Sequence, residues 1–373
     1  MSTLTNFRLP LFCFFAATLG LFFGTAARAD LWVIPSDNGS TTPGIFRFED
    51  RTGAFLDQFG PDSEGYEGMA KGPDDKIYLA GNTLGYGDVS RFNLNGQYLG
   101  HFTGASLRTP GALTFEADGD CYVLCSNWPQ TPSLQQIWRY HGTTGAFKDV
   151  FITDAGDARA LRFGRDGHLY VADSARGIVR YNGSSGAFLD TFVPLGRGGL
   201  RDVHTFVFGP DGNVYAGTWI SNAVVRFNGN TGAFLDYVVA PGSGGLNQPG
   251  GLAFGPDGSL YVSSTATHNI LRFDGRTGAF RGVFAAHSEL ISPTALVFTP
   301  PAPRLLIQHV GLKVEISWPN SGSPQNWSLV TQAKSATTTG WVAVTNSLAI
   351  VGTNCVVTDR CDGRSVFYRL DQR

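Results

Sequence analysis

The chain has 373 residues and a net charge of −2, with 16% charged and 13% aromatic residues. Its 48 glycines follow no Gly-X-Y period, which excludes collagen, and its apolar content excludes a wholly disordered chain. The weak negative charge argues against a nucleic-acid partner, because such a partner requires a clustered basic surface.

The first segment, residues 1–29, has the pattern of a secretory signal peptide. Arg8 precedes an apolar run of 14 residues over 11–24, and residues 27–29 (Ala-Arg-Ala) have the small-x-small spacing of a cleavage site. An uncleaved anchor is the alternative, but a membrane span needs about 20 apolar residues. We therefore expect export to the periplasm or the cell exterior, with cleavage near Ala29 and no membrane span in the mature chain.

A repeat occupies residues 30–299. The position just before each Gly-Pro-Asp-Gly-like turn recurs at intervals of 44 to 48 residues. The six aligned residues are Lys71, Phe115, Phe163, Phe208, Phe254 and Phe298. Each repeat contains four short runs rich in β-branched and aromatic residues, separated by Pro-Asp-Gly and Asp-Gly-x-Thr-Gly turn sequences. Four strands per repeat, without a sustained helical period, predict one blade of a β-propeller.

The two ends of the repeat region predict how the ring closes. The sixth repeat, around Phe298, has only a first strand. Residues 31–34, 45–48 and 53–55 supply the missing strands from the other end of the chain. We therefore predict an all-β fold, a six-bladed β-propeller whose last blade joins both ends, because an open sheet would leave exposed edges.

Two alignment columns carry the same kind of residue in every repeat. One position of the second strand is aromatic: Trp32, Tyr78, Tyr122, Tyr170, Tyr215 and Tyr261. One position of the third strand is arginine: Arg47, Arg91, Arg139, Arg180, Arg226 and Arg272. An anion-binding ring is one interpretation of these arginines. We interpret them as structural, because each lies beside aromatic residues on which its stem can pack.

The recurring GPDG-x-hydrophobic-Tyr-Val core and the TGAFL turn phrase resemble the NHL-repeat and streptogramin-lyase-like six-bladed propellers of secreted bacterial proteins. This resemblance covers residues 30–300 and extends more distantly to gluconolactonase-like propellers. The resemblance implies the propeller fold. Its link to the lyases implies acid–base residues at the channel mouth, and Glu67 and His204 match these in residue type. Its more distant link to the lactonases implies a divalent cation at the channel mouth.

Propeller topology predicts where a site would lie. The loops between second and third strands share a face with the connections between blades, and variable residues gather on that face. We expect ligand-binding residues there, with Glu67 and His204 as catalytic candidates. The binding candidates are Glu67, Arg159, Asp173, His204, Asp202, Asn127, Trp128 and Trp219. Charged and aromatic residues at one end of a central channel are typical of a binding site.

Each candidate also has a structural interpretation. His204 could bond the backbone at a strand start, Glu67 could pair with Arg159, and Asp173 could stabilise the turn that follows it. Calcium takes six or more oxygen ligands, and the sequence offers fewer. We therefore predict no cofactor, with calcium at Glu67 and Asp173 as the alternative.

Residues 300–303 form a proline-rich linker, and residues 304–373 lose the repeat. The strands expected there are 305–309, 313–318, 327–331, 341–345, 355–358 and 366–370. They predict a small β-sandwich-like domain that resembles a fibronectin-like module. Trp318, Trp327 and Trp341 would form its core, and a carbohydrate-stacking platform is the alternative.

The cysteines of the mature chain form two pairs. Cys355 and Cys361 flank a plausible turn, which predicts a disulfide. Cys121 and Cys125 lie four residues apart along a strand, about 13 Å, and are predicted to be free.

No complete catalytic motif is present, so the sequence favours a secreted binding or scaffold propeller. It engages an unidentified ligand or protein partner at the channel mouth, and a monomer is favoured. A lactonase- or lyase-type enzyme with a divalent cation is the alternative.

Overall fold

The computed structural model describes residues 29–35, 44–60, 65–83, 86–104, 107, 109–116, 119–126, 135–299, 306–310, 313–319, 327–333, 342–344, 348–351, 354–360 and 366–372. Residues 1–28 of the predicted signal peptide lie outside this set. In the described part, strands dominate, and the helical elements are the short 3-10 segments η1 (Arg197–Gly199), η2 (Ser243–Gly245) and η3 (Thr265–Thr267).

Six four-stranded antiparallel sheets form the blades. The closing blade contains β24 (Pro293–Phe298), β1 (Leu31–Pro35), β2 (Ile45–Phe48) and β3 (Phe55–Phe59). The second contains β4 (Tyr66–Lys71), β5 (Ile77–Thr83), β6 (Tyr86–Phe92) and β7 (Tyr98–His101). The third contains β8 (Leu113–Phe115), β9 (Cys121–Ser126), β10 (Gln135–Tyr140) and β11 (Phe147–Ile152).

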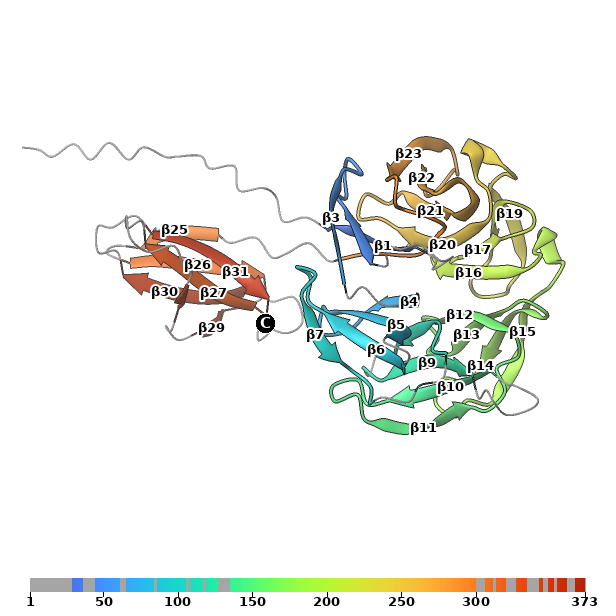
Figure 1. Ribbon diagram of the computed structural model, residues 1–373, viewed down its shortest axis with the longest axis horizontal. Coiled ribbons are helices and arrows are strands. Elements are labelled where there is room, and N and C mark those ends of the chain that lie inside the picture. Colours follow the sequence, from blue (N-terminus) through green and yellow to red (C-terminus); the bar gives the residue numbers. More distant parts are fainter. Residues whose placement is uncertain are drawn as a thin grey trace, which may run out of the picture.

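The other three blades follow in chain order. The fourth contains β12 (Ala158–Phe163), β13 (Leu169–Asp173), β14 (Gly177–Tyr181) and β15 (Phe188–Pro194). The fifth contains β16 (Val203–Phe208), β17 (Val214–Thr218), β18 (Ala223–Phe227) and β19 (Phe234–Val239). The sixth contains β20 (Pro249–Phe254), β21 (Leu260–Ser264), β22 (Asn269–Phe273) and β23 (Phe280–Ala286). Figure 1 shows the blades arranged around a centre, with β4, β12, β16 and β20 close to it.

The predicted ring closure is confirmed. β24 pairs antiparallel with β1, so Trp32 lies opposite Val297 and Val33 lies opposite Leu296. The junction extends beyond the strands, because the backbone N–H of Asp30 donates to Thr299 Oγ1 at 2.9 Å and the N–H of Thr299 donates to the Asp30 carbonyl at 2.9 Å.

The predicted alignment is also confirmed, since each of its six aligned residues is the last residue of an inner strand. The inner strands lie very close together near the centre. A Cβ at Gly251 would stand 2.3 Å from the carbonyl oxygen of Thr294, and one at Gly68 would stand 2.3 Å from that of Gly111. Glycine is required at both positions, because real Cβ atoms do not approach backbone so closely.

The repeated arginines are structural, as predicted. Each pairs in register with the aromatic residue of the neighbouring second strand. Four of them form ion pairs with an aspartate on the outer strand: Arg47–Asp57, Arg139–Asp149, Arg180–Asp190 and Arg226–Asp236. In the sixth blade Gly282 takes the aspartate position, and Arg272 pairs with Asp257 instead.

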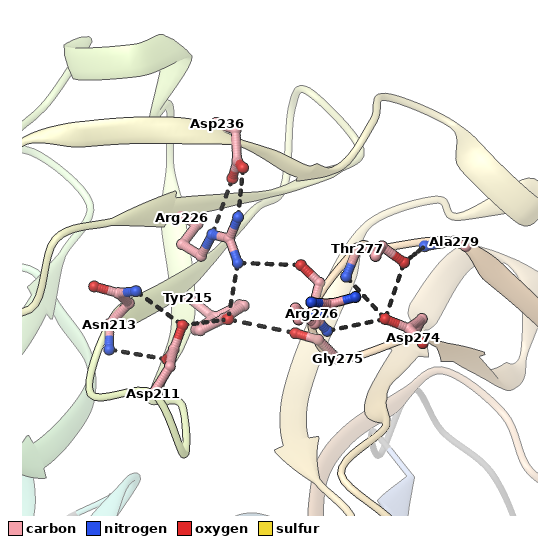
Figure 2. A network of polar contacts seen from close by, with 10 residues as sticks. All are labelled: Asp211, Asn213, Tyr215, Arg226, Asp236, Asp274, Gly275, Arg276, Thr277 and Ala279. Atoms are coloured by element: carbon pink, nitrogen blue, oxygen red, sulfur yellow. Dashed lines mark hydrogen bonds and ion pairs between the residues drawn. The ribbon is translucent and has the colours of Figure 1, made fainter.

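Arg47 and Arg226 also tie neighbouring blades together, as Figure 2 shows for Arg226. Its guanidinium donates to Asp236, to Tyr215 Oη at 3.3 Å and to the Arg276 carbonyl of the next blade at 3.2 Å. Tyr215 Oη lies 3.0 Å from Asp211 Oδ2 and 3.4 Å from the Gly275 carbonyl oxygen. The turn aspartate, the tyrosine and the arginine therefore connect strands within a blade and across to its neighbour.

The C-terminal segment forms two further antiparallel sheets. One has the order β25 (Leu306–Val310), β26 (Lys313–Pro319), β30 (Asn354–Arg360) and β29 (Leu348–Val351). The other has the order β28 (Val342–Ala343), β27 (Trp327–Ala333) and β31 (Val366–Gln372). The sequence missed β29, and the sandwich-like and fibronectin-like arrangement stays a prediction. The core expected of Trp318, Trp327 and Trp341 depends on side chains that lie outside the described set. The predicted linker at residues 300–303 also lies outside it.

The cysteine predictions differ in outcome. Cys121 and Cys125 are free, as expected, and both are buried. Cys361 is outside the described residues, so the disulfide with Cys355 remains a prediction. In the part of the chain that the structure describes, no helix is long and apolar enough to span a membrane.

Candidate functional site

The inner strands surround a cavity of about 600 Å³ at the centre of the ring. Three layers of residues on the inner strands, defined by their distance in sequence from the aligned residues, serve to describe the positions around the channel. The mouth layer is Glu67, Gly111, Arg159, His204, Gly250 and Thr294. The small-residue layer below it is Gly68, Ala112, Ala160, Thr205, Gly251 and Ala295, all of which line the cavity. The deep layer is Ala70, Thr114, Arg162, Val207, Ala253 and Val297.

Four predicted site residues come together at this cavity. Glu67, Arg159, His204 and Trp219 all line it, and they come from the second, fourth and fifth blades. The small-residue layer makes this possible, because glycine and alanine leave the space that larger side chains would fill. A cavity of this size with a few polar groups fits a small ligand.

His204 is held from two sides. Its Nε2 lies 3.2 Å from Asp202 Oδ1, and its ring stacks on Trp219 with centroids 4.6 Å apart and planes inclined by 21°. The backbone N–H of Trp219 donates to the backbone carbonyl of Asp202 at 3.3 Å. This bond fixes the loop that carries the indole. Asp202 has a left-handed backbone with φ of 52°, so the turn into β16 is a strained conformation that places its carboxylate beside the imidazole. An oriented imidazole can bind a ligand or exchange a proton.

Glu67 stands over Gly111. Its Oε2 is 3.6 Å from where a Cβ at residue 111 would lie, which is an ordinary van der Waals distance, so the carboxylate lies directly beside this backbone. Enclosure by the channel walls raises the pKa of Glu67, and the positive charge of Arg159 opposes this rise. The two side chains interact electrostatically, but Arg159 forms its ion pair with Asp157 at 3.0 Å and donates to Ser174 Oγ at 3.0 Å.

The raised pKa of Glu67 predicts that its ionised form destabilises the fold. This destabilisation disappears as the pH falls toward the ordinary pKa of glutamate, 4.5, because the carboxyl is then protonated in the folded protein. Glu67→Gln should therefore raise the melting temperature at pH 7 by about 1–2 °C, and the gain should vanish at pH 4. Thermal unfolding at both pH values tests this, with exposed Glu289→Gln as the control. Equal melting temperatures of wild type and Glu67→Gln at pH 7 would contradict it.

Asp173 lies apart from the cavity lining. Its side chain is fully buried, and Oδ1 accepts the backbone N–H groups of Ala175 and Arg176 at 2.8 Å each. Its Oδ2 accepts Arg176 Nε at 2.7 Å. The aspartate therefore holds the turn after β13, in agreement with its structural interpretation.

The other predictions for the site concern two loop residues and a metal ion. Asn127 and Trp128 lie outside the described residues. Within the described ranges, no group of three or more His, Cys, Asp or Glu side chains is arranged to hold a metal ion.

The sequence missed one charged residue of the cavity. Arg162 lines it from the deep layer, three residues after Arg159 on the same strand. Comparing the six repeats at this position would have identified it, because the other five residues are uncharged.

Comparisons with known proteins agree on the architecture. A chain in the crystal structure of the nidogen/laminin complex is 13% identical, with a TM-score of 0.58 over 73% of this chain and 99% of that chain. The protein described here therefore contains a six-bladed β-propeller. A protein of unknown function from Bacteroides caccae is 12% identical, with a TM-score of 0.55 over 73% of this chain and 99% of that one.

A catalytically inactive virginiamycin B lyase from Staphylococcus aureus, with quinupristin, is 17% identical, with a TM-score of 0.46 over 69% of this chain and 82% of that one. No family model and no curated protein matches the propeller chain. The six four-stranded sheets and the first two similar structures confirm the propeller fold expected from the sequence resemblance, and identities this low show the fold alone.

Proposed function

We propose that this propeller is an exported binding protein that takes a small ligand into the cavity at its channel mouth. One observation carries the proposal: a cavity of about 600 Å³ into which Glu67, Arg159, His204 and Trp219 converge from three blades. The small-residue layer keeps the cavity open, and the Asp202–His204–Trp219 contacts hold its wall in place. The signal-peptide pattern of residues 1–29 supports export.

A ligand screen with cavity variants tests the proposal. Small molecules that bind the mature protein should bind Trp219→Ala about tenfold or more weakly, because the substitution removes the indole and the stacked support of His204. Ile220→Ala is the matched control, since Ile220 is the next residue and its side chain is 63% exposed. Titration calorimetry measures both affinities. Compounds that bind all three proteins equally would place binding elsewhere and contradict the proposal.

One observation favours the alternative, a lactonase- or lyase-type enzyme. His204, oriented by Asp202, shares the cavity with Glu67, so two titratable groups could serve as acid and base. Metal analysis of the purified protein and turnover assays on lactones and cyclic esters test this function. One tightly held divalent cation per chain, or turnover lost in Glu67→Ala and in His204→Ala, would favour the enzyme.

A further inference from the structure

Arg162 has an unusual place among the arginines of the propeller. It belongs to the inner strand β12, whereas the six repeated arginines lie on third strands and none of them lines the cavity. It is the only charged residue of the deep layer, whose other members are alanine, valine and threonine. No symmetry of the repeat therefore explains a cation at this position.

The charge of Arg162 is not compensated by the described protein. Its Nη1 donates to the Leu161 carbonyl on its own strand at 2.8 Å, and no carboxylate of the described residues lies within ion-pair distance. Burial lowers the pKa of this guanidinium. In contrast, Arg226 has a carboxylate, a phenol and a carbonyl around it.

An enclosed guanidinium of this kind favours an anion. Isolated charges are costly in a poorly solvated place, and guanidinium has five N–H donors in a planar fork that matches a carboxylate or a phosphate. Arg162 lies about 10 Å of strand from Arg159 in the mouth layer, at about 3.3 Å per residue. A molecule that enters the mouth can therefore place one end against Arg162 while its other end contacts the mouth layer.

We propose that Arg162 binds an oxyanion group, a carboxylate or a phosphate, at the inner end of the ligand. This inference rests on the proposed binding function and names the chemistry of the ligand. The cavity wall between the two arginines is uncharged, because it consists of the small-residue layer and of apolar residues such as Met69, Leu113 and Leu252, so the cavity accepts an uncharged organic body behind the charged group.

The test uses the mature protein with inorganic phosphate and with acetate as probes, at constant ionic strength. Both anions should raise the melting temperature of the wild type and of Arg165→Met, a control at an exposed arginine in the turn that follows β12. For Arg162→Met the apparent affinity should be about tenfold or more weaker. Arg162→Lys, which keeps the charge and loses the fork, should fall between them.

The unliganded protein provides a second readout. Without added anions, Arg162→Met should melt at or above the temperature of the wild type, because it removes an uncompensated charge. A response to phosphate alone or to acetate alone would support the proposal and identify the group. The proposal would be overturned if unliganded Arg162→Met melted at a lower temperature than the wild type. It would also be overturned if anions raised the melting temperatures of Arg162→Met and of the wild type equally. If ligand binding that depends on Trp219 persists in that case, the proposed function stands and only the role of Arg162 fails.

Discussion

Val33→Asp should unfold the propeller or lower its free energy of unfolding by about 4 kcal/mol or more. Val33 is fully buried in the closing blade, where it pairs with Phe46 on one side and Leu296 on the other. Its cluster also includes Tyr261 and Ile270 of the sixth blade. A carboxylate at this position would therefore lose its hydration both within the closing sheet and between two blades.

Leu56→Asp is the matched control for this experiment. Leu56 belongs to the same blade but lies on the outer strand β3, and its side chain is 40% exposed. Its replacement should change stability by less than about 1 kcal/mol. Thermal and denaturant unfolding followed by circular dichroism measure both effects. Equal stability of the two variants would show that β1 and β24 do not close the ring.

Arg226→Met should lower the free energy of unfolding by about 2–3 kcal/mol. The side chain of Arg226 is 17% exposed, and its loss leaves Asp236 without its partner and breaks the bond to the Arg276 carbonyl of the next blade. The hydroxyl of Tyr215, which also loses its bond to Arg226, keeps Asp211 as a hydrogen-bond partner. The cost should therefore come mainly from the contact between blades, because the Asp236 side chain is 46% exposed and water can replace its partner.

A second arginine–aspartate pair provides the comparison. Arg281 pairs with Asp274 at 2.7 Å, but its side chain is 56% exposed. Arg281→Met should cost less than about 1 kcal/mol, because solvent screens such a pair. Chemical denaturation of both variants measures the difference. If Arg281→Met were as destabilising as Arg226→Met, the repeated arginine would add nothing beyond a surface ion pair.

Most of the fold could be predicted from the sequence because each blade repeats the same local chemistry. Turn sequences mark both hairpins of a repeat, and the aligned aromatic residue ends every inner strand except at Lys71. The single strand around Phe298 required partners, and β1 supplies them. Outside the repeat this reasoning weakens: β29 is a four-residue apolar run with no repeated context, and it was missed.

The repeat also shows where individual blades differ. Trp32 takes the tyrosine position of the closing blade, and its buried indole Nε1 has no hydrogen-bond partner among the residues that the structure describes. In the second blade Gly100 replaces the outer-strand aspartate, and within the described part of the chain the buried Nε of Arg91 has no hydrogen-bond partner. The sequence identified both positions as parts of the scaffold but could not show which bonds they lack.

The site was predicted in part, for a topological reason. Propeller connectivity places the starts of the inner strands at one end of the channel, so Glu67, Arg159 and His204 had to share that end. Trp219 follows from the loop after β17. Arg162 was not predicted because the topology places only the mouth layer at the channel opening, although a long side chain can reach the cavity from a deeper position.

The hydrogen bonds between Asp30 and Thr299 join residues that are 269 positions apart in the sequence. A short peptide from Thr299 to Asp30 would therefore connect them without spanning the ring, and the backbone could be cut instead in a turn between two other blades. Such a circular permutant should keep all six sheets and the cavity, with its new termini on a blade of choice. Fusion partners or surface attachments could then be placed at any blade around the circumference.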